Sequence, residues 1–391
     1  MIFIVGYPYV GERHRRVFDF FNKKDDLVLI LPEVWKMKGG KVVMKADSLA
    51  NESGLKIIPE KTRFFNSNHP IVKGHLKGWM PATKKILKEM ARPGDILYSV
   101  SEPNLFVTYL YVKIAKKLNL KHIFFTWQNV PYKSRLSGLK LKLTEWLIKK
   151  NIALSSGVIC GNIKALEVIK PYLPDNFPHL VAPVSGMDTE KFRPGIASDF
   201  RAKYDLENKT IVLFVGAIDN RKGIFKLVDA FVEAKKKEDS LHLVIIGSGP
   251  LDKELENYVR LARSDKDIII LSWIDNKDLP GYFANSDIFV YPSQPYGGWE
   301  EQFGYSIAEA SSSGLPVIST KTGSIGDIVI DGKTGVLIDS ENIAGLSRAI
   351  WELAQDKNLR DTMGYAGREF VTNNFSHQII ADKLENFLRN I

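Results

Sequence analysis

The chain has 391 residues, of which 45% are hydrophobic and 25% are charged, an ordinary composition that excludes a disordered or fibrous protein. At about 150 residues per domain, this length predicts two or three domains. The single cysteine, Cys160, excludes an intramolecular disulfide and a metal site built from four thiolates. The formal net charge of +9 indicates an anionic partner.

The charge is divided unevenly along the chain. Residues 1–200 contain 32 Lys and Arg against 17 Asp and Glu, a net +15. Residues 201–391 contain the remaining 22 and 28, a net −6. A basic half joined to an acidic half predicts two lobes with different roles. The totals alone do not distinguish nucleic acid, a phosphorylated substrate and a membrane surface as the anionic partner.

Short apolar segments alternate with helical patterns in both halves of the chain, which is typical of parallel sheets covered by helices. The strands are predicted at 2–5, 27–31, 95–100, 122–126, 157–160 and 179–182, then at 210–215, 241–246, 268–271, 288–291 and 316–320. The helices are predicted at 82–90, 105–118, 136–150 and 163–170, then at 224–237, 252–263 and 306–312.

These elements predict an α/β protein with two doubly wound, Rossmann-like lobes that face a cleft, where ligands bind at the carboxyl ends of the strands. Pro183 and Gly186 interrupt the periodic patterns and indicate a boundary between domains 1–185 and 186–375. The segment 376–391 has helical spacing and is expected to pack back on the first lobe.

No apolar run approaches the ~20 residues that span a bilayer. The first segment, 2–5, lacks a basic region before it and a cleavage site after it, so it is predicted to be a buried strand rather than a signal peptide. We therefore expect a cytoplasmic protein.

A pair of glutamates gives the sharpest chemical signal. Glu301 and Glu309 are separated by seven residues and enclose Phe303-Gly304, which follow a predicted strand and open a helix. The backbone N–H groups of residues 304–306 lie at the positive end of that helix, where a diphosphate can bind while the carboxylates accept hydrogen bonds from sugar hydroxyls. The alternative is a solvated loop charge and a surface helix charge.

A glycine and a lysine follow the first strand of the second half. Gly216 permits close approach of a ligand to the backbone, and Lys222, followed by Gly223, can bind a phosphate as a point charge. Taken alone, this spacing is more typical of a surface turn.

The turns after two strands of the first lobe are candidates for contact with a second substrate. They contain Tyr9, Gly11, His14, Gln128 and Asn129. The histidines form no pair with metal-ligand spacing, and we expect no metal site.

The segment Arg135–Lys150 combines basic residues with a helical stripe of apolar ones. The stripe consists of Leu136, Leu139, Leu143, Trp146 and Leu147. It fits a helix that lies on an anionic lipid surface. It fits equally an ordinary helix packed on the sheet with a solvated basic face.

These residues resemble the retaining group 1 glycosyltransferases of GT-B fold. Glu301 to Glu309 match the E-x7-E signature of that family, Gly216 and Lys222-Gly223 match its phosphate loop, and Gly186-Met187-Asp188 match its hinge. The resemblance is specific over roughly residues 186–335. It implies transfer of a sugar from a UDP- or GDP-sugar, with retention at the anomeric carbon, and no required metal or other cofactor.

The resemblance also implies roles for individual residues. Glu301 and Lys222 would be catalytic, with Glu301 on the donor-sugar hydroxyls, Lys222 on the diphosphate and Glu309 on the ribose. The remaining donor-binding residues would be Gly216, Arg221, Phe303, Gly304, Tyr305 and Ser306.

By the same resemblance, the domain 1–185, with the helix 376–391, would bind the acceptor, and 186–375 would bind the nucleotide sugar. The acceptor would be a glycan or a lipid-linked molecule, as in cell-surface polysaccharide, glycolipid or glycoprotein synthesis. Peripheral contact with the inner face of the membrane would use Arg135–Lys150, and no nucleic acid is expected. Three features depart from the family pattern: Ala217 replaces an arginine, Gln128 replaces a histidine, and the paired glycines after the first strand are reduced to Gly11.

Three other interpretations stay open at this point. A nucleotide-sugar 2-epimerase shares the two-lobe plan and would consume donor without acceptor. A basic nucleic-acid binder would show salt-sensitive binding to DNA or RNA. A catalytically silent partner subunit would fit the replacements at Ala217 and Gln128.

Overall fold

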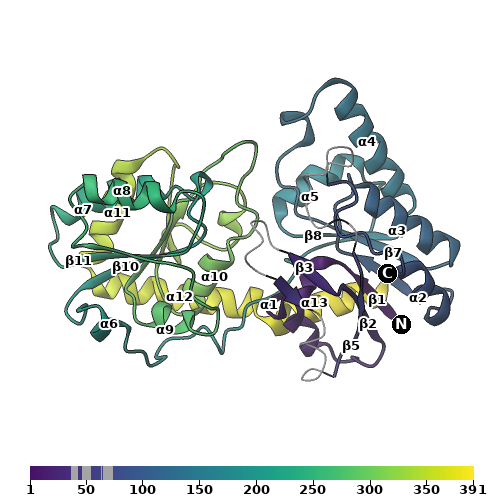
Figure 1. The fold of residues 1–391 in the computed structure, drawn as a ribbon, viewed down its shortest axis with the longest axis horizontal. Coiled ribbons are helices and arrows are strands. Elements are labelled where there is room, and N and C mark those ends of the chain that lie inside the picture. The colour runs from purple at the N-terminus through teal and green to yellow at the C-terminus, as the bar shows by residue number, and fades with distance from the viewer. Residues whose placement is uncertain (37–42, 46–53, 63, 65–73) are drawn as a thin grey trace. The chain divides into compact units, whose positions relative to one another are not determined.

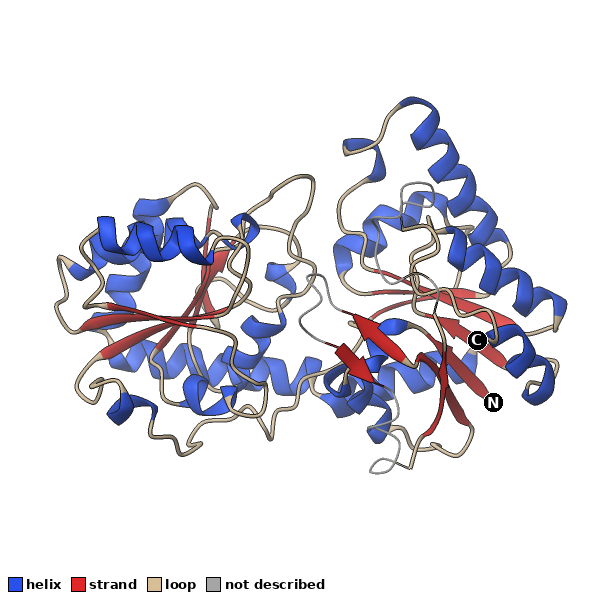
Figure 2. Ribbon diagram, viewed as in Figure 1, coloured by secondary structure: helices blue, strands red, loops and turns tan. Residues whose placement is uncertain are grey.

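The structure is a computed structural model, and it describes residues 1–36, 43–45, 54–62, 64 and 74–391. Its contacts divide the chain into two compact units (Figure 1). The first unit contains Met1–Gly186 and His377–Ile391, and the second contains Met187–Ser376. In each unit helices cover both faces of a sheet (Figure 2).

The first unit is built on a seven-stranded parallel sheet with the order β5-β2-β1-β6-β7-β8-β9. Its strands are β1 (Ile2–Val5), β2 (Leu27–Pro32), β5 (Lys56–Glu60), β6 (Ile96–Ser99), β7 (Lys121–Thr126), β8 (Gly157–Cys160) and β9 (His179–Val181). A separate antiparallel pair consists of β3 (Val34–Lys36) and β4 (Val43–Lys45).

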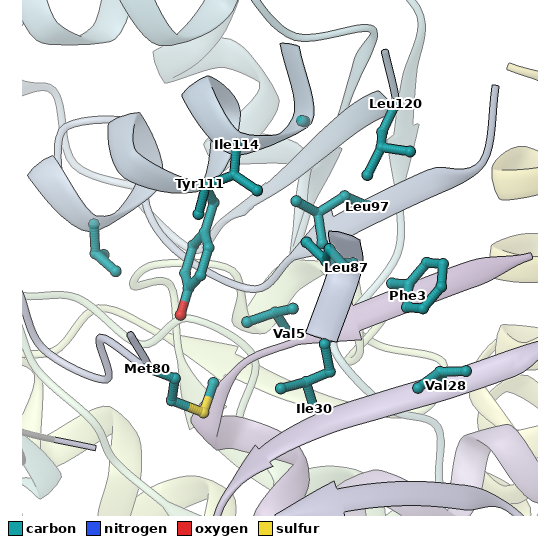
Figure 3. Packing of buried hydrophobic residues seen from close by; sticks show 12 residues of the cluster. Phe3, Val5, Val28, Ile30, Met80, Leu87, Leu97, Tyr111, Ile114 and Leu120 are labelled. Carbon is teal, nitrogen blue, oxygen red and sulfur yellow. The ribbon is translucent and has the colours of Figure 1, made fainter. Parts of the chain in front are cut away.

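Helices pack on both faces of this sheet because its central strands are apolar on both sides. On one face Phe3, Val28 and Leu97 of the strands pack against Leu87 and Tyr111 of two helices (Figure 3). The helices of the unit are α1 (Glu12–Arg15), α2 (Thr83–Met90), α3 (Phe106–Lys117), α4 (Gly138–Ala153), α5 (Ile163–Ile169) and α13 (His377–Asn390).

The C-terminal helix α13 is held in the first unit by charged groups as well as by apolar packing. Glu385 accepts a hydrogen bond from the backbone N–H of Asn22 at 2.7 Å, and Arg389 pairs with Asp26 at 2.8 Å. These contacts join residues more than 350 positions apart in the sequence.

The second unit is built on a six-stranded parallel sheet with the order β12-β11-β10-β13-β14-β15. Its strands are β10 (Thr210–Val215), β11 (Leu241–Ile246), β12 (Ile268–Leu271), β13 (Ile288–Tyr291), β14 (Val317–Thr320) and β15 (Gly335–Ile338). Its helices are α6 (Phe200–Lys203), α7 (Ile224–Lys235), α8 (Asp252–Leu261), α9 (Leu279–Ala284), α10 (Tyr305–Ser312), α11 (Ile343–Gln355) and α12 (Lys357–Phe375). Figure 1 shows α7, α8 and α11 on one face of this sheet and α9 and α12 on the other.

The predicted fold class is confirmed, and each predicted strand is present in the described residues. Two edge strands, β5 and β15, were not predicted from the sequence. The segment Lys56–Glu60 begins and ends on charged residues and contains a proline, so only its pairing with β2 defines it as a strand. The units divide one residue after the predicted boundary, and their roles as acceptor and donor domains stay predictions.

The first and last residues of the second unit, Met187 and Ser376, lie side by side. The Met187 N–H donates to the Phe375 carbonyl at 2.7 Å, and Met187 forms a parallel bridge with Ser376. Among the described residues, none of the helices combines the length and apolar character that crossing a membrane requires.

Candidate active site

A buried ion pair joins two loops of the second unit. Lys222 Nζ lies 2.5 Å from Glu301 Oε2, and the two residues are only 8% and 6% exposed. Lys222 ends a short 3-10 turn after β10, and Glu301 lies in the loop between β13 and α10. The ammonium also lies 4.8 Å and 4.9 Å from the ring centroids of Tyr291 and Trp299. The two residues predicted to be catalytic are thus in direct contact.

Gly223 fixes the direction in which the chain leaves Lys222. Its φ of +64° lies in the left-handed region, and a Cβ there would be 2.1 Å from the Pro292 carbonyl oxygen. Only glycine fits both conditions. Before it, the Asp219 side chain caps the turn by accepting from the Arg221 N–H at 3.0 Å. Lys222 is therefore presented by a rigid turn.

Arg221, predicted to assist at the diphosphate, is engaged within its own loop. Its Nε donates to Asp219 Oδ2 at 3.0 Å, and its guanidinium lies 4.4 Å from the ring centroid of Trp299. A contact with the donor stays a prediction for this residue.

Glu301 is positioned by the loop that follows β14. The Ser324 N–H donates to the Glu301 carbonyl oxygen at 2.8 Å, and the Gly323 N–H donates to Glu300 Oε2 at 3.0 Å. Gly323 has a φ of +55°, and a Cβ there would be 2.0 Å from the Glu301 carbonyl oxygen. The N–H groups of Gly323 and Ser324 therefore hold the loop that contains Glu300 and Glu301, which we call the acidic loop. Sequence reasoning missed this role, although the small residues after a parallel strand were a usable signal.

Two hydroxyls of the same loop are buried without a hydrogen-bond partner among the described residues. They are Thr322 Oγ1 and Ser324 Oγ. Buried polar groups are almost always hydrogen-bonded, so these two hydroxyls are places where an ordered water would be bound.

Helix α10 begins at Tyr305, as the motif predicts, with Gly304 at a φ of +79°. The first N–H groups of a helix have no acceptor within it, so Gly304, Tyr305 and Ser306 direct theirs outward at the positive helix end. Phe303 is buried, with its ring 4.7 Å from that of Tyr305. The start of α10 is therefore fixed in place.

Glu309 is 1% exposed, which excludes the alternative of a surface helix charge. Asn276 Nδ2 donates to Glu309 Oε1 at 3.5 Å, and Asn276 Oδ1 in turn accepts from Lys191 Nζ at 2.6 Å. A buried carboxylate with such partners is held in one orientation.

Gly216 lies where three segments approach closely. A Cβ on Gly216 would be 3.1 Å from the Phe214 ring, and one on Gly247 would be 1.8 Å from the Gly216 carbonyl oxygen. Packing thus accounts for this glycine, and its contact with a donor stays a prediction.

In the first unit, the candidate acceptor residues have mostly internal partners. Tyr9 is fully buried and donates to the Val184 carbonyl at 3.1 Å, so it is a core residue in this structure. His14 Nδ1 lies 3.2 Å from the Pro8 carbonyl, and burial together with Arg13 lowers its pKa to about 4.

The remaining three candidates lie in turns at strand ends. Gln128 is half-buried, and its Nε2 donates to the Val130 carbonyl. Asn129 is buried, and Gly11 has an ordinary extended conformation. The acceptor roles of all five residues stay predictions.

A small cavity of about 60 Å³ lies in the first unit at the carboxyl ends of β1, β6 and β7. Glu102 lines it, with Oε2 accepting from Thr126 Oγ1 at 2.6 Å and Oε1 from the Trp127 N–H at 2.7 Å. Burial raises the Glu102 pKa to about 7. Tyr7 also lines the cavity, and its ring stacks on Trp35 at 4.2 Å.

Sequence reasoning missed Glu102. It directly follows the predicted strand 95–100 and so lies at the carboxyl end of a parallel strand, which was a sufficient signal. No group of three or more His, Cys, Asp or Glu side chains is placed to hold a metal ion in the part of the chain that the structure describes.

Curated relatives match about half of this chain. The GDP-mannose-dependent alpha-(1-6)-phosphatidylinositol monomannoside mannosyltransferase of Mycobacterium tuberculosis (strain CDC 1551 / Oshkosh) is 31% identical over 208 residues, 52% of this chain and 54% of the relative. The capsular polysaccharide biosynthesis glycosyltransferase CapM of Staphylococcus aureus is 30% identical over 206 residues, 51% of this chain and 52% of the relative. The match thus spans about half the length of these relatives.

Solved structures share the fold of the whole chain. Anabaena Alr3699/HepE, solved in complex with UDP, superposes with a TM-score of 0.76 at 16% identity and covers 100% of this chain and 99% of its own. Sucrose-phosphate synthase from Thermosynechococcus elongatus gives 0.75 at 19% identity, with 99% and 98% covered. Both likenesses concern the fold, which is the GT-B arrangement of two Rossmann-like lobes.

The sequence model of the family described as Glycosyl transferases group 1 matches residues 197–370, which contain Lys222, Glu301, Glu309 and the start of α10. This match covers less than half of the chain and lies within the second unit, which is thus similar in sequence to group 1 glycosyltransferases.

Proposed function

We propose that the protein transfers a sugar from a UDP- or GDP-sugar to a hydroxyl of a glycan or lipid-linked acceptor, with retention at the anomeric carbon. The observation that carries the proposal is the buried contact between Lys222 and Glu301 beside the amino end of α10. A cation, a carboxylate and helix N–H groups in one place suit a ligand that has both a diphosphate and hydroxyls.

The donor diphosphate would bind at the amino end of α10 and draw Lys222 away from Glu301. The ammonium then neutralises the phosphate oxygens, and the released carboxylate accepts hydrogen bonds from the donor sugar. Glu309 would bind the ribose.

In the transfer step, the bond between the anomeric carbon and the diphosphate oxygen breaks while the acceptor oxygen bonds to the same face of that carbon. The acceptor proton passes to the leaving diphosphate. Negative charge grows on that diphosphate in the transition state, so Lys222 and the helix N–H groups stabilise the transition state more than the bound donor.

The acceptor would contact the first unit with a hydroxyl near Glu102, outside the cavity of about 60 Å³, which is too small for a sugar. An aromatic stack, a lysine and a carboxylate gather there, since Lys77 Nζ lies 4.5 Å from the ring centroid of Tyr7. Aromatic surface with a few placed polar groups is the usual lining of a small-molecule site.

Donor identity is tested by thermal unfolding with a panel of UDP-, GDP- and ADP-sugars. A donor at 100 times its dissociation constant stabilises the protein by about 2.7 kcal/mol. We expect one nucleotide class to do so in the wild type and to fail in Lys222→Ala. The absence of stabilisation by every nucleotide sugar would contradict the proposal.

Transfer is tested with the stabilising donor and a mixture of glycan and lipid-linked acceptors. We expect acceptor-dependent release of the nucleoside diphosphate, and a product whose anomeric proton shows by NMR the same configuration as in the donor. Conversion of the donor to its epimer without acceptor would instead identify a nucleotide-sugar 2-epimerase.

A further inference from the structure

Helix α4 is apolar on two opposite faces. Its inner face packs in the core of the first unit through Ile148 and Ile152, which are fully or almost fully buried. On its outer face Leu139, Leu143 and Trp146 are 83%, 61% and 49% exposed. Their spacing of four and three residues places these three side chains in one row along the helix. We call them the outer row.

Such a row is unusual on the solvent side of a helix. A surface helix normally carries polar residues there, and exposed apolar patches on soluble proteins mark contact sites. The packed core accounts only for the inner face. Figure 1 shows α4 at the outer edge of the first unit, and its inner residues Ile148 and Ile152 share a core cluster with β7 and β8.

Lysines surround the outer row. At 3.6 residues per turn, Lys142 and Lys149 fall on one side of it, Lys140 on the other and Lys150 in line with its end. All four are exposed. Glu145, the single acidic residue of α4, points elsewhere and accepts a hydrogen bond from the Tyr172 hydroxyl at 3.2 Å. The face is therefore apolar along its middle and positive at its margins.

From this arrangement we infer that the outer face of α4 binds the surface of a membrane that contains anionic lipids. Leucine and tryptophan side chains enter the boundary between headgroups and acyl chains, while lysines reach back to the lipid phosphates. A second copy of the chain fits this face less well, because it would bring two sets of four lysines together. The inference stands apart from the proposed sugar transfer.

A single labelled cysteine tests insertion. Cys160 is the only cysteine in the chain, and it is buried with a pKa raised to about 12, so a thiol introduced by Leu143→Cys reacts selectively. Leu261→Cys is the control, since Leu261 is 83% exposed, against 61% for Leu143, but lies in the second unit. Each variant carries a polarity-sensitive maleimide fluorophore.

We expect the label at position 143 to shift to the blue with vesicles of phosphatidylglycerol and phosphatidylcholine in equal parts. It should shift far less with phosphatidylcholine alone or in high salt, and the label at position 261 should not respond. Equal responses of the two labels, or no response to anionic vesicles, would overturn the inference.

Co-sedimentation of unlabelled variants separates the apolar and charged contributions. We expect Leu139→Ser combined with Trp146→Ser to weaken partition into anionic vesicles at least tenfold. Lys142→Gln and Lys149→Gln should each weaken it about fivefold. Lys88→Gln, the same charge change on an exposed site of α2, should have much less effect.

Two outcomes would overturn the inference here. One is wild-type partition of the outer-row variants. The other is concentration-dependent self-association in sedimentation velocity that these variants abolish, which would assign the face to a second copy. Neither readout depends on nucleotide sugars, so failure here leaves the proposed transfer untouched.

Discussion

Lys222 Nζ and Glu301 Oε2 are 2.5 Å apart in the second unit, with both side chains buried and 79 positions between them in the sequence. In the proposed function, the donor diphosphate replaces the Glu301 carboxylate as the partner of the Lys222 ammonium. Removing one member of a buried ion pair without such a replacement is costly.

Removal of either partner should reduce both activity and stability. We expect Lys222→Met and Glu301→Gln each to lower kcat/KM by about 10²-fold or more. Each should also cost about 3 kcal/mol of unfolding free energy by leaving a buried group uncompensated. Steady-state kinetics and urea unfolding measure the two effects.

The double variant Lys222→Met/Glu301→Gln separates these effects. It should recover part of the stability, because no unpaired charge is left, while it stays inactive. Lys226→Ala is the control, since Lys226 pairs at 2.6 Å with the exposed Glu341, and exposed pairs contribute about 0–1 kcal/mol. Near-normal turnover in either single variant would contradict the catalytic role proposed for that residue.

Gly323→Ala should impair the site without touching any charged group. The new Cβ would lie 2.0 Å from the Glu301 carbonyl oxygen, at a φ of +55°, so the acidic loop must move. We expect a loss of roughly 10-fold or more in kcat/KM, since displacing a positioned group by 1 Å has effects up to 10²-fold. Gly326→Ala is the control, because a Cβ there has no atom within 4 Å. Equal activities of the two variants would contradict the positioning role of Gly323.

Local patterns predicted the pieces of the candidate site better than their contacts. Lys222, Glu301 and Glu309 each lie in a short motif next to an apolar strand, which is why the sequence could indicate them. The contact between Lys222 and Glu301 depends on β10 lying beside β13, with Val212 opposite Ile288. Strand order is set by packing of the whole sheet rather than by local spacing.

The sequence was least informative where apolar residues serve both the core and the exposed surface of one helix. Helix α4 is apolar on both faces, so periodicity could not tell which leucines enter the core. Leu147 belongs to the buried set, whereas Leu139 and Leu143 are exposed. The small residues around Gly323 indicated a loop after a strand, but local spacing could not show that this loop contacts the Glu301 backbone.

His122 should make the first unit less stable as the solution becomes acidic. It is buried between Ser99 and Ser155, with ring nitrogens 2.9 Å and 2.8 Å from their hydroxyls. Burial lowers its pKa from 6.5 to about 3. Between these values the unfolded chain binds a proton that the folded chain does not, so stability is present above pH 6.5 and is lost as the pH falls.

Between pH 7 and pH 5, the titration of His122 is expected to lower the free energy of unfolding by about 2 kcal/mol. This loss is measured as the difference in urea unfolding between the wild type and His122→Gln at each pH. The variant lacks the titrating ring, so its stability should fall less over this range. Parallel pH profiles for the two proteins would show that His122 does not carry this dependence.

Glu102 should make acceptor use depend on pH, because burial raises its pKa whereas it lowers that of His122. Burial raises its pKa to about 7, so the carboxylate that can accept a hydrogen bond from an acceptor hydroxyl forms only as the pH rises through that value. We expect kcat/KM for the acceptor to increase about tenfold per pH unit below pH 7 and to level off above it.

Glu102→Gln should remove this inflection and lower the plateau by roughly 10-fold, while donor binding measured by thermal shift stays unchanged. The amide oxygen can accept from the Trp127 N–H, and the amide NH2 can donate to the Thr126 hydroxyl, so the variant can preserve both contacts with one of them reversed. Glu167→Gln on the exposed side of α5 is the control. An unchanged pH profile in Glu102→Gln would place acceptor binding elsewhere, because Glu102 is the only carboxyl group among the described residues that line this cavity.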